Sequence, residues 1–420
     1  MKTKAVRIYG KKDLRLEEFE LPDIKDGEIL AKIISDSICM SSYKAAMQGA
    51  DHKRVPKDIL VNPTIIGHEF AGVILEVGKK WKNKFHSGQK FAIQPAMAHM
   101  GTLDAPGYSY RFIGGDATHI IIPEIVMEAD CLLPYDGEAF FPASLSEPMS
   151  CIVGAYHASY HVTPGTYNHE MGIRKGGNLA ILAGTGPMGL GAIDYALHNE
   201  RKPTLIAVTD IDEIRLLRAS RLFTPEHAEN EGIKLVYVNT SKAESPVSYV
   251  TNLTGGKGFD DVFVFAPVKQ VVEQADMLLG FDGCLNFFAG PSNPEFKADI
   301  NFYNVHYAFT HIMGTSGGNT DDMRESLQLM SEGKINPAVM ITHVGGLDSV
   351  IETTLNLPSI PGGKKLIYTN ISMPLVSLDR LEELGKTNKF YEGLHEIVAG
   401  NDCIWSLEAE KYLLANAKQI

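Results

Sequence analysis

The stretch from Thr64 to Gly78, TIIGHEFAGVILEVG, places a histidine and a glutamate side by side in a segment apolar enough to form a buried strand. An imidazole nitrogen and a carboxylate oxygen are both common ligands of Zn²⁺, which in catalytic sites takes three protein ligands and keeps one position open. His68 and Glu69 also have an ordinary interpretation, as a hydrogen-bonded histidine and a water-facing glutamate. Choosing between the two interpretations requires further ligands elsewhere in the chain.

Two further candidate zinc ligands lie far from this stretch in the sequence. Cys39 occurs in DSICMSSYK, and Glu147 occurs in SLSEPMSCIVGAYH. A lone cysteine is most often a packing residue, and a glutamate before a proline most often begins a helix. Combined with His68 and Glu69, they would supply a thiolate, an imidazole and carboxylates to one Zn²⁺ ion. Zinc held in this way polarises a carbonyl or an alkoxide as a Lewis acid.

A dinucleotide-binding pattern in the middle of the chain would complement such a metal. The apolar run NLAILAG leads into a G-x-G-x-x-G that opens a helix, formed by Gly184, Thr185, Gly186, Pro187, Met188 and Gly189. Glycines let the backbone approach a pyrophosphate, and the helix N-terminus offers it N–H groups and a positive dipole. The pattern therefore predicts a nicotinamide cofactor, whose hydride chemistry needs a partner that polarises the reacting oxygen.

Asp210 determines which nicotinamide cofactor is expected. It ends the next apolar run, TLIAVTD, 21 residues past the last glycine of the pattern. A carboxylate at this place accepts the ribose hydroxyls and repels a 2′-phosphate, so NAD(H) is predicted and NADP(H) is the alternative. Arg215 and Arg218, on the following helix, would soften that preference if they reached the cofactor.

The elements that must carry these residues divide the chain into a β-rich part and an α/β part. Over residues 1–154, short alternating patterns such as GEILAKIISDSIC are separated by turn signals, which predicts a β-rich domain. Over residues 155–305, apolar runs alternate with helical patterns, which predicts a doubly wound parallel sheet covered on both faces. Residues 306–420 are predicted to return to the first domain and to end in a docked helical extension.

Composition restricts the partners and the compartment. The chain has 420 residues, 44% of them hydrophobic, and a net charge of −12, which is typical of a globular protein with more than one domain. The acidic balance disfavours nucleic acid or an anionic membrane as a partner. Five scattered cysteines without a C-x-x-C pair, and a start without an apolar secretory segment, predict a reduced cytoplasmic protein. The most apolar stretch, LAILAGTGPMGLGAI, contains four glycines and a proline and is unsuited to a membrane span.

Several motifs in order along the chain resemble the zinc-dependent branch of the medium-chain dehydrogenase/reductase family, the alcohol and polyol dehydrogenases. The motifs are Cys39 with Ser41, the G-H-E of residues 67–69 with Gly72, the pair Glu147 and Pro148, and AGTGPMGLGA. The resemblance covers about residues 1–370. It implies a GroES-like catalytic domain and a Rossmann cofactor domain. It also implies that Cys39 and His68 bind zinc, while Glu69 either binds the metal or exchanges with Glu147 and water.

The same resemblance assigns further roles. The hydroxyl of Ser41 would pass a proton between the substrate and solvent, and Lys44 stands where many relatives place a histidine of the same relay. The region QPAMAHMGTLDAPGYSYRFIGGDATH holds no cysteine where relatives have a four-cysteine lobe. We therefore expect one catalytic zinc and no structural zinc. Because relatives pair edge strands of their cofactor domains, a homo-oligomer, dimer or tetramer, is expected.

Three phrases, SSYKAAMQGADHKRVPKD, HEMGIRKGG and YRFIGGDATHIIIP, are similar to a sugar-phosphate-specific subgroup, the bacterial sorbose-1-phosphate reductases. This similarity implies interconversion of L-sorbose 1-phosphate and D-glucitol 6-phosphate. A phosphate needs local cations, and the candidates are Lys44, Arg54 and Arg111, with Lys53 expected to be a surface charge. Lys44, at the relay position, and Arg111, set among aromatic residues, are the favoured candidates. In the stretch TYNHEMGIRKGG of residues 166–177, the charged residues either line the cleft between domains or face solvent.

Two other functions fit the same residues. One is a different polyol or polyol-phosphate dehydrogenase, of the sorbitol or galactitol-1-phosphate type. The other, from a different class, is a metal-free member of the family that serves as a nucleotide-binding or redox-sensing protein. The joint presence of Cys39, His68, Glu69 and Glu147 counts against the second alternative, because a metal-free protein has no need of all four.

Overall fold

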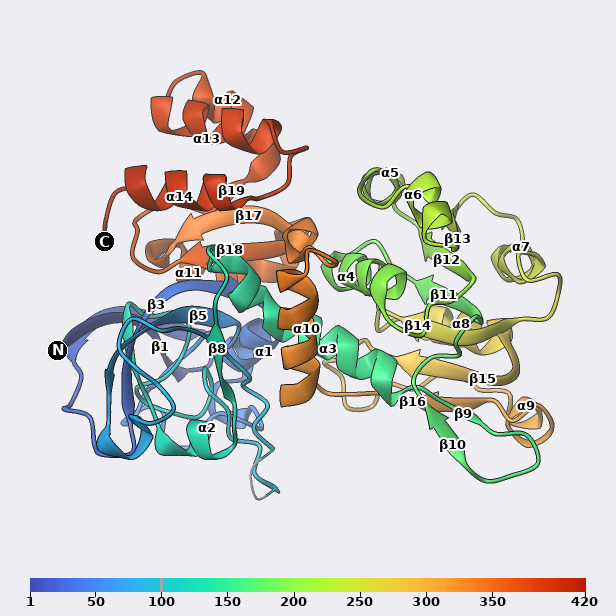
Figure 1. Cartoon of the computed structure of the whole chain (residues 1–420), viewed down its shortest axis with the longest axis horizontal. Helices are drawn as coiled ribbons and strands as arrows, with labels where there is room; N and C mark the ends of the chain where they lie inside the picture. The colour runs from blue at the N-terminus through green and yellow to red at the C-terminus, as the bar shows by residue number, and fades with distance from the viewer. Residues whose placement is uncertain (99–100) are drawn as a thin grey trace. The chain divides into compact units, whose positions relative to one another are not determined.

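The computed structural model describes residues 1–98 and 101–420 and divides them into two compact units (Figure 1). Unit 1 comprises residues 1–148, 319–331 and 340–420, and unit 2 comprises residues 149–318 and 332–339. The sequence predicted domain changes at residues 154 and 305. In the structure the chain leaves unit 1 within a helix, at Pro148, and first re-enters it at Asn319.

Unit 1 is the β-rich part. Its larger sheet has the strand order β19-β17-β18-β3-β5-β6-β8, with β7 paired to β3, and a smaller sheet has the order β2-β1-β4. The strands are β1 (Lys2–Gly10), β2 (Asp13–Glu20), β3 (Ile29–Ile38), β4 (Thr64–Ile65), β5 (Phe70–Val77), β6 (Lys90–Ile93), β7 (His119–Ile122), β8 (Leu132–Tyr135), β17 (Ile341–Gly346), β18 (Lys364–Tyr368) and β19 (Val376–Ser377). The helices are α1 (Met40–Gln48), α2 (Glu124–Glu128), α10 (Thr320–Ser331), α11 (Val350–Asn356), α12 (Leu381–Gly385), α13 (Lys389–Ala399) and α14 (Leu407–Asn416). Helix α3 (Phe141–Ala158) belongs partly to each unit.

Unit 2 is a doubly wound sheet. All six strands pair in parallel in the order β13-β12-β11-β14-β15-β16. The strands are β11 (Asn178–Leu182), β12 (Leu205–Asp210), β13 (Lys234–Asn239), β14 (Phe259–Val264), β15 (Leu279–Phe287) and β16 (His311–Met313), and a hairpin adds β9 (Tyr160–Val162) and β10 (His169–Met171). The helices are α4 (Pro187–His198), α5 (Glu213–Leu222), α6 (Pro225–Asn230), α7 (Pro246–Asn252), α8 (Lys269–Leu278) and α9 (Phe302–Tyr307).

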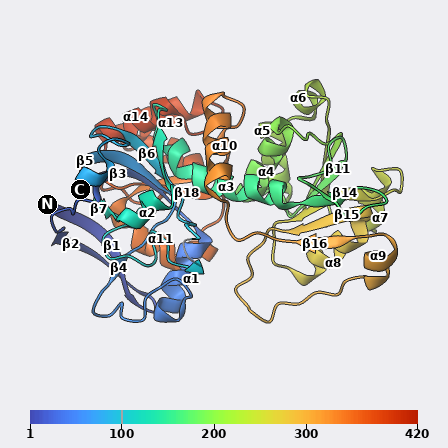
Figure 2. The ribbon, with the colours of Figure 1, turned by 60° about the horizontal axis from the view of Figure 1, so that its bottom comes forward.

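The burial of the strands reflects helices on both faces of this sheet. Every residue of β12 is buried, as expected for a parallel strand with helices on both faces. Figure 2 shows α4, α5 and α6 on one face of the sheet and α8 on the other. The strand order reverses between β11 and β14, and ligands of open α/β sheets bind at such a point, beyond the carboxyl ends of the strands. The predicted fold class is therefore confirmed for both units.

The C-terminal extension packs on unit 1 through buried polar contacts. The indole N–H of Trp405 donates to the hydroxyl of Tyr368 on β18 (2.8 Å), and that hydroxyl donates to the Glu410 carboxylate (2.9 Å). The same carboxylate accepts the main-chain N–H groups of Phe140 (2.7 Å) and Phe141 (3.0 Å) at the start of α3. Glu410 thus caps a helix from another part of the chain.

No helix of the described residues is both long and apolar enough to cross a membrane.

Candidate active site

Cys39 lies at the junction of a strand and a helix. Strand β3 ends at Ile38, and Cys39 is the N-cap residue of α1. Burial raises the pKa of the Cys39 thiol, and the negative charge of Glu69 raises it further. A metal cation that replaced the thiol proton would remove this penalty, because zinc binds the thiolate.

His68 lies in the short connection between β4 and β5, where two glycines from different segments approach each other closely. Gly67 has a φ of +92°, and a Cβ on Gly107 would lie 2.0 Å from the Gly67 carbonyl oxygen, so neither position accepts a side chain. This close approach brings Tyr108 beside His68, with the Tyr108 hydroxyl 3.2 Å from Nε2. The Ser42 hydroxyl lies 3.1 Å from Nδ1 on the other side of the ring. Burial lowers the pKa of His68, which favours the neutral imidazole that binds metals.

Glu69 is held by a lysine that the sequence did not single out. The ammonium of Lys364, on β18, lies 2.5 and 2.7 Å from the two carboxylate oxygens of Glu69. The side chains are 6% and 1% exposed. Burial alone would raise the pKa of Glu69, but the Lys364 charge outweighs it and the pKa is lowered. Glu69 is therefore an ionised carboxylate inside the protein, and it is stabilised by a partner that comes from a distant strand.

The three residues converge on one point. The sulfur of Cys39, a ring nitrogen of His68 and a carboxylate oxygen of Glu69 all lie within 4.8 Å of one another. Ligands around a tetrahedral Zn²⁺ lie about 3.3 to 3.7 Å apart, given bond lengths of about 2.0 to 2.3 Å, so small side-chain movements would complete the site. Among the residues that the structure describes, this is the only such group of three histidine, cysteine or acidic side chains. The donor set fits zinc.

Glu147 lies inside α3 rather than at a helix start. It precedes Pro148 within the helix, and it is buried, with 8% of its surface exposed. Burial and the charge of Glu69 raise its pKa to about 7. Its oxygens are not among the three converging ligand atoms, although its charge acts on His68. The structure therefore brings Cys39, His68 and Glu69 together and leaves Glu147 as their neighbour.

Positive charge gathers beside this group. The guanidinium carbon of Arg54 lies 5.4 Å from the centre of the Tyr108 ring, and the ring of His52 stacks on Tyr108 at 5.7 Å. Burial, followed by the charges of Arg54, Lys53 and Lys44, lowers the pKa of His52 to about 4. Neither His52 nor Tyr108 was predicted from the sequence, and no local motif marks either residue.

The other predicted substrate-binding residues lie in different surroundings. Ser41 lies in the first turn of α1, and its hydroxyl is close enough to Tyr108 to lower the pKa of that phenol against the larger effect of burial. Lys44, on the same helix, is half-buried. Arg111 is exposed, with its guanidinium 5.2 Å from the ring of Phe112. Ser41 and Lys44 are thus near Tyr108 and His52, whereas Arg111 lies against Phe112.

The predicted cofactor loop in unit 2 has the shape that a pyrophosphate requires. A Cβ on Gly189 would lie 2.2 Å from the Gly184 carbonyl oxygen, so the third glycine lets the helix pack against the loop. A Cβ on Gly186 would meet no protein atom within 4 Å, which leaves that side of the loop open to a ligand. Pro187 begins α4 directly after the loop. The loop, with Thr185 and Met188, fits a dinucleotide.

Asp210 stands at the carboxyl end of β12, against this loop. Its carboxylate accepts the hydroxyl of Thr185 and the N–H of Ile211 (2.8 Å). Arg218 is turned elsewhere, since its guanidinium donates to the Val339 carbonyl (2.8 Å). Arg215 lies 3.5 Å from Asp212. Both arginines thus make these contacts away from Asp210.

The stretch of residues 166–177 is anchored within unit 2. The Arg174 guanidinium lies 2.6 Å from Asp282 and 3.1 Å from Asp260. Buried His161, on the neighbouring strand β9, has Nδ1 3.0 Å from the Asp282 carbonyl oxygen and Nε2 3.2 Å from the Asp261 carboxylate. Both neighbours are acceptors, so both ring nitrogens donate. Burial lowers the pKa of His161, but Asp261 outweighs it and the pKa is raised overall.

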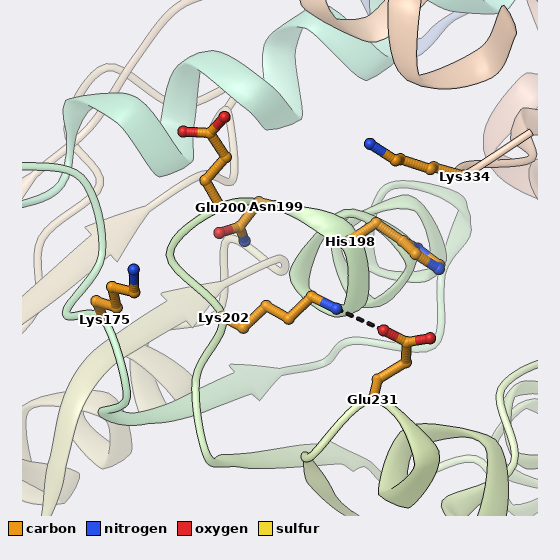
Figure 3. Close-up of a pocket in the computed structure, with 7 residues that line it drawn as sticks. All are labelled: Lys175, His198, Asn199, Glu200, Lys202, Glu231 and Lys334. Carbon is orange, nitrogen blue, oxygen red and sulfur yellow. Dashed lines mark hydrogen bonds and ion pairs between the residues drawn. The ribbon is translucent and has the colours of Figure 1, made fainter. Parts of the chain in front are cut away.

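A separate hollow of about 500 Å³ lies in unit 2, at the amino ends of the sheet strands (Figure 3). It is lined by Lys175, His198, Asn199, Glu200, Lys202, Glu231 and Lys334. Lys175 and Lys202 precede β11 and β12, so the hollow lies at the amino ends of the strands, away from Gly186 and Asp210. Lys202 pairs with Glu231 (2.5 Å) across it. The hollow is not the dinucleotide site.

Comparisons with known proteins agree with this division. A family described as zinc-binding dehydrogenase matches residues 187–332, and one described as the alcohol dehydrogenase GroES-like domain matches residues 25–129. The chain is 55% identical to a mannitol-1-phosphate 5-dehydrogenase of Aliivibrio fischeri, over 98% of this chain and 97% of that one. It is 51% identical to an L-sorbose 1-phosphate reductase of Klebsiella pneumoniae, over 100% and 98%.

A solved structure supports the fold independently. The crystal structure of 2R,3R-butanediol dehydrogenase from Bacillus subtilis superposes with a TM-score of 0.71 at 22% identity. The match covers 88% of this chain and all of that one. Together these findings confirm the predicted resemblance.

Proposed function

The chain belongs to the zinc-binding alcohol and polyol dehydrogenase family of oxidoreductases, and within that family we propose that it is a cytoplasmic, NAD(H)-dependent reductase of a ketose phosphate. The favoured reaction converts L-sorbose 1-phosphate to D-glucitol 6-phosphate. The second candidate is oxidation of D-mannitol 1-phosphate, in view of the Aliivibrio relative's name. The observation that carries the proposal is the convergence of the Cys39, His68 and Glu69 donor atoms within 4.8 Å.

In this proposal Cys39, His68 and Glu69 hold one zinc ion, and Glu147 exchanges with Glu69. When bound, zinc would polarise the carbonyl of the ketose and the reduced nicotinamide would supply the hydride. Ser42 keeps the His68 ring oriented through Nδ1. No second set of ligands of this kind occurs among the described residues, which is consistent with a single zinc per chain.

Ser41 supplies the proton. Its hydroxyl donates to the substrate oxygen as negative charge develops there, and the neighbouring hydroxyl of Tyr108 offers a route for replacing the proton. Lys44 lies one turn further along α1 and keeps the surroundings positive. In unit 2, the loop from Gly184 to Gly189 binds the pyrophosphate and Asp210 binds the ribose.

Two variants and a substrate panel test the proposal. Cys39→Ser and His68→Ala should abolish turnover and zinc binding but leave NADH binding intact, because the dinucleotide loop lies in the other unit. Ser146→Ala, in the same unit, is the control, since the Ser146 hydroxyl only bonds the Ala143 carbonyl (2.6 Å). Loss of NADH binding together with turnover would show that these residues serve folding instead. The panel compares ketose phosphates with free ketoses and polyols.

We also propose that the protein is a homo-oligomer joined at the β16 edge of the unit 2 sheet. Strand β16 ends the sheet, and large apolar side chains are exposed around it, with Phe302 76%, Phe281 66% and Ile312 48% exposed. Unpaired edge strands and exposed apolar patches favour association. Light scattering on wild type and Ile312→Asp tests this. A wild-type monomer at micromolar concentration would refute it.

A further inference from the structure

One cation beside the candidate metal centre, Arg54, has a covered N–H group without an acceptor among the described residues. Arg54 is half-buried, and its Nε is fully covered without a hydrogen-bond acceptor. Its main chain is fixed, because its N–H donates to His52 Nδ1 (3.3 Å) and its carbonyl accepts the Ser109 hydroxyl (2.7 Å). Among the described residues, no carboxylate pairs with its guanidinium. Arg54 is therefore held in place while its Nε stays without an acceptor.

The lack of a carboxylate partner distinguishes Arg54 from several other arginines of this acidic chain. There are 51 aspartates and glutamates against 39 lysines and arginines, and other arginines such as Arg15, Arg201 and Arg324 pair with carboxylates. A covered donor without an acceptor costs about 1 to 3 kcal/mol. Such a cost is expected where a ligand later supplies the acceptor, as in binding sites whose polar groups are arranged in advance.

The position of Arg54 identifies the site that it serves. Its guanidinium lies over the ring of Tyr108, 5.4 Å from the ring centre, and the hydroxyl of that ring is 3.2 Å from His68 Nε2. The aromatic face limits how the guanidinium plane can turn. Lys44 and Lys53 add positive charge that also acts on His52. An anion bound by Arg54 would thus lie next to the candidate metal centre.

We infer that Arg54, stacked on Tyr108, is the principal binding residue for the phosphate group of the substrate, with Lys44 as its support. This inference rests on the proposed function and deepens it, since it names the residue that distinguishes phosphorylated from free sugars. A guanidinium binds a phosphate bidentately through two of its N–H groups. Arg111, the other predicted arginine, lies against Phe112 and is not required.

The test compares Arg54→Gln and Arg54→Lys with Lys57→Gln. Lys57 is exposed and its ammonium donates to the Ala50 carbonyl (2.5 Å), so its variant removes one positive charge nearby without touching Tyr108. kcat/KM is measured with NADH for L-sorbose 1-phosphate, D-fructose 6-phosphate and both free ketoses. Arg54→Gln should lose roughly ten- to a hundred-fold on the phosphorylated sugars and much less on the free ones. Arg54→Lys should be intermediate, because lysine makes no bidentate contact.

Separate outcomes distinguish the inference from the proposed function. If wild type prefers the phosphorylated sugars but Arg54→Gln loses equally on both forms, the inference is overturned and the proposed function stands. If wild type prefers free ketoses, the proposed substrate is wrong. A thermal shift assay with inorganic phosphate then tests whether Arg54 binds the phosphate group. Phosphate should stabilise wild type and Lys57→Gln but not Arg54→Gln. Equal stabilisation of wild type and Arg54→Gln overturns the inference in either case.

Discussion

Replacing Lys364 by methionine should destabilise the metal-free protein and make its stability depend on zinc. The Lys364 ammonium lies 2.5 and 2.7 Å from the two carboxylate oxygens of Glu69, and both side chains are buried. Removing one partner of a buried ion pair costs about 3 to 5 kcal/mol, because the other charge is left uncompensated. In domains of about 150 to 250 residues, each kcal/mol lowers the unfolding midpoint by about 2 to 4 °C. We therefore expect the midpoint to fall by about 6 to 20 °C.

Calorimetry of metal-free and zinc-loaded protein measures this effect. A zinc ion beside Glu69 supplies the missing positive charge, so zinc should raise the midpoint more in Lys364→Met than in wild type. The double variant Glu69→Gln with Lys364→Met removes both charges and should recover much of the lost stability. The reasoning is refuted if metal-free Lys364→Met is as stable as wild type. It is also refuted if the double variant is no more stable than Lys364→Met, because packing of the lysine stem would then explain the loss.

Three other predictions follow from the remaining contacts. Wild type should have a higher kcat/KM with NADH than with NADPH, and Asp210→Ala should narrow that ratio, so a strong wild-type preference for NADPH would contradict the role of the carboxylate. Glu410→Ala should lower the free energy of unfolding by about 1 to 3 kcal/mol, because two N–H groups at the start of α3 lose their acceptor. Glu408→Gln, exposed on the same helix, should change little, and equal effects of both would contradict the capping role. For His161, whose pKa is raised by Asp261 against the effect of burial, the stabilisation is full below about pH 6.5 and is lost as pH rises through the folded-state pKa. The difference in unfolding free energy between wild type and His161→Gln should therefore be smaller at pH 9 than at pH 6 in urea titrations, and a constant difference would contradict the charged form.

The parts of the molecule that local patterns encode were predictable from the sequence. The six parallel strands of unit 2 read as apolar runs because helices cover both faces of the sheet. The loop from Gly184 to Gly189 was predictable from its glycine spacing, since a Cβ on Gly184 or Gly189 would clash with neighbouring atoms and Gly186 leaves one side of the loop open. Cys39, His68 and Glu69 were recognised as a set only through their order along the chain, and the structure brings their donor atoms together.

Residues whose role depends on distant partners were not predictable. Lys364 lies in GGKKLIYTN, where nothing distinguishes it from Lys365, and its role comes from the antiparallel pairing of β18 with β3, beside the strand that follows Glu69. Glu147 was expected to begin a helix if it was not a ligand, yet α3 continues through Pro148. Glu410 caps that helix from a position far along the chain. Pairing across long sequence separations leaves no periodic signal.

Two cations of unit 1, Lys364 and Arg54, differ in a way that distinguishes a structural role from a substrate-binding role. Lys364 and Arg54 both lie near the candidate metal centre, but the Lys364 ammonium is satisfied by Glu69, and the Nε of Arg54 has no acceptor. The buried Lys364–Glu69 pair needs no ligand to complete it, so removing Lys364 should mainly lower the free energy of unfolding. A guanidinium with an N–H group that lacks an acceptor contributes little to folding and is available to bind an anion. Removing it should therefore lower kcat/KM for phosphorylated substrates more than it lowers the free energy of unfolding. If Arg54→Gln lowered stability as strongly as Lys364→Met, that separation would fail, and Arg54 would have to be regarded as part of the folded framework.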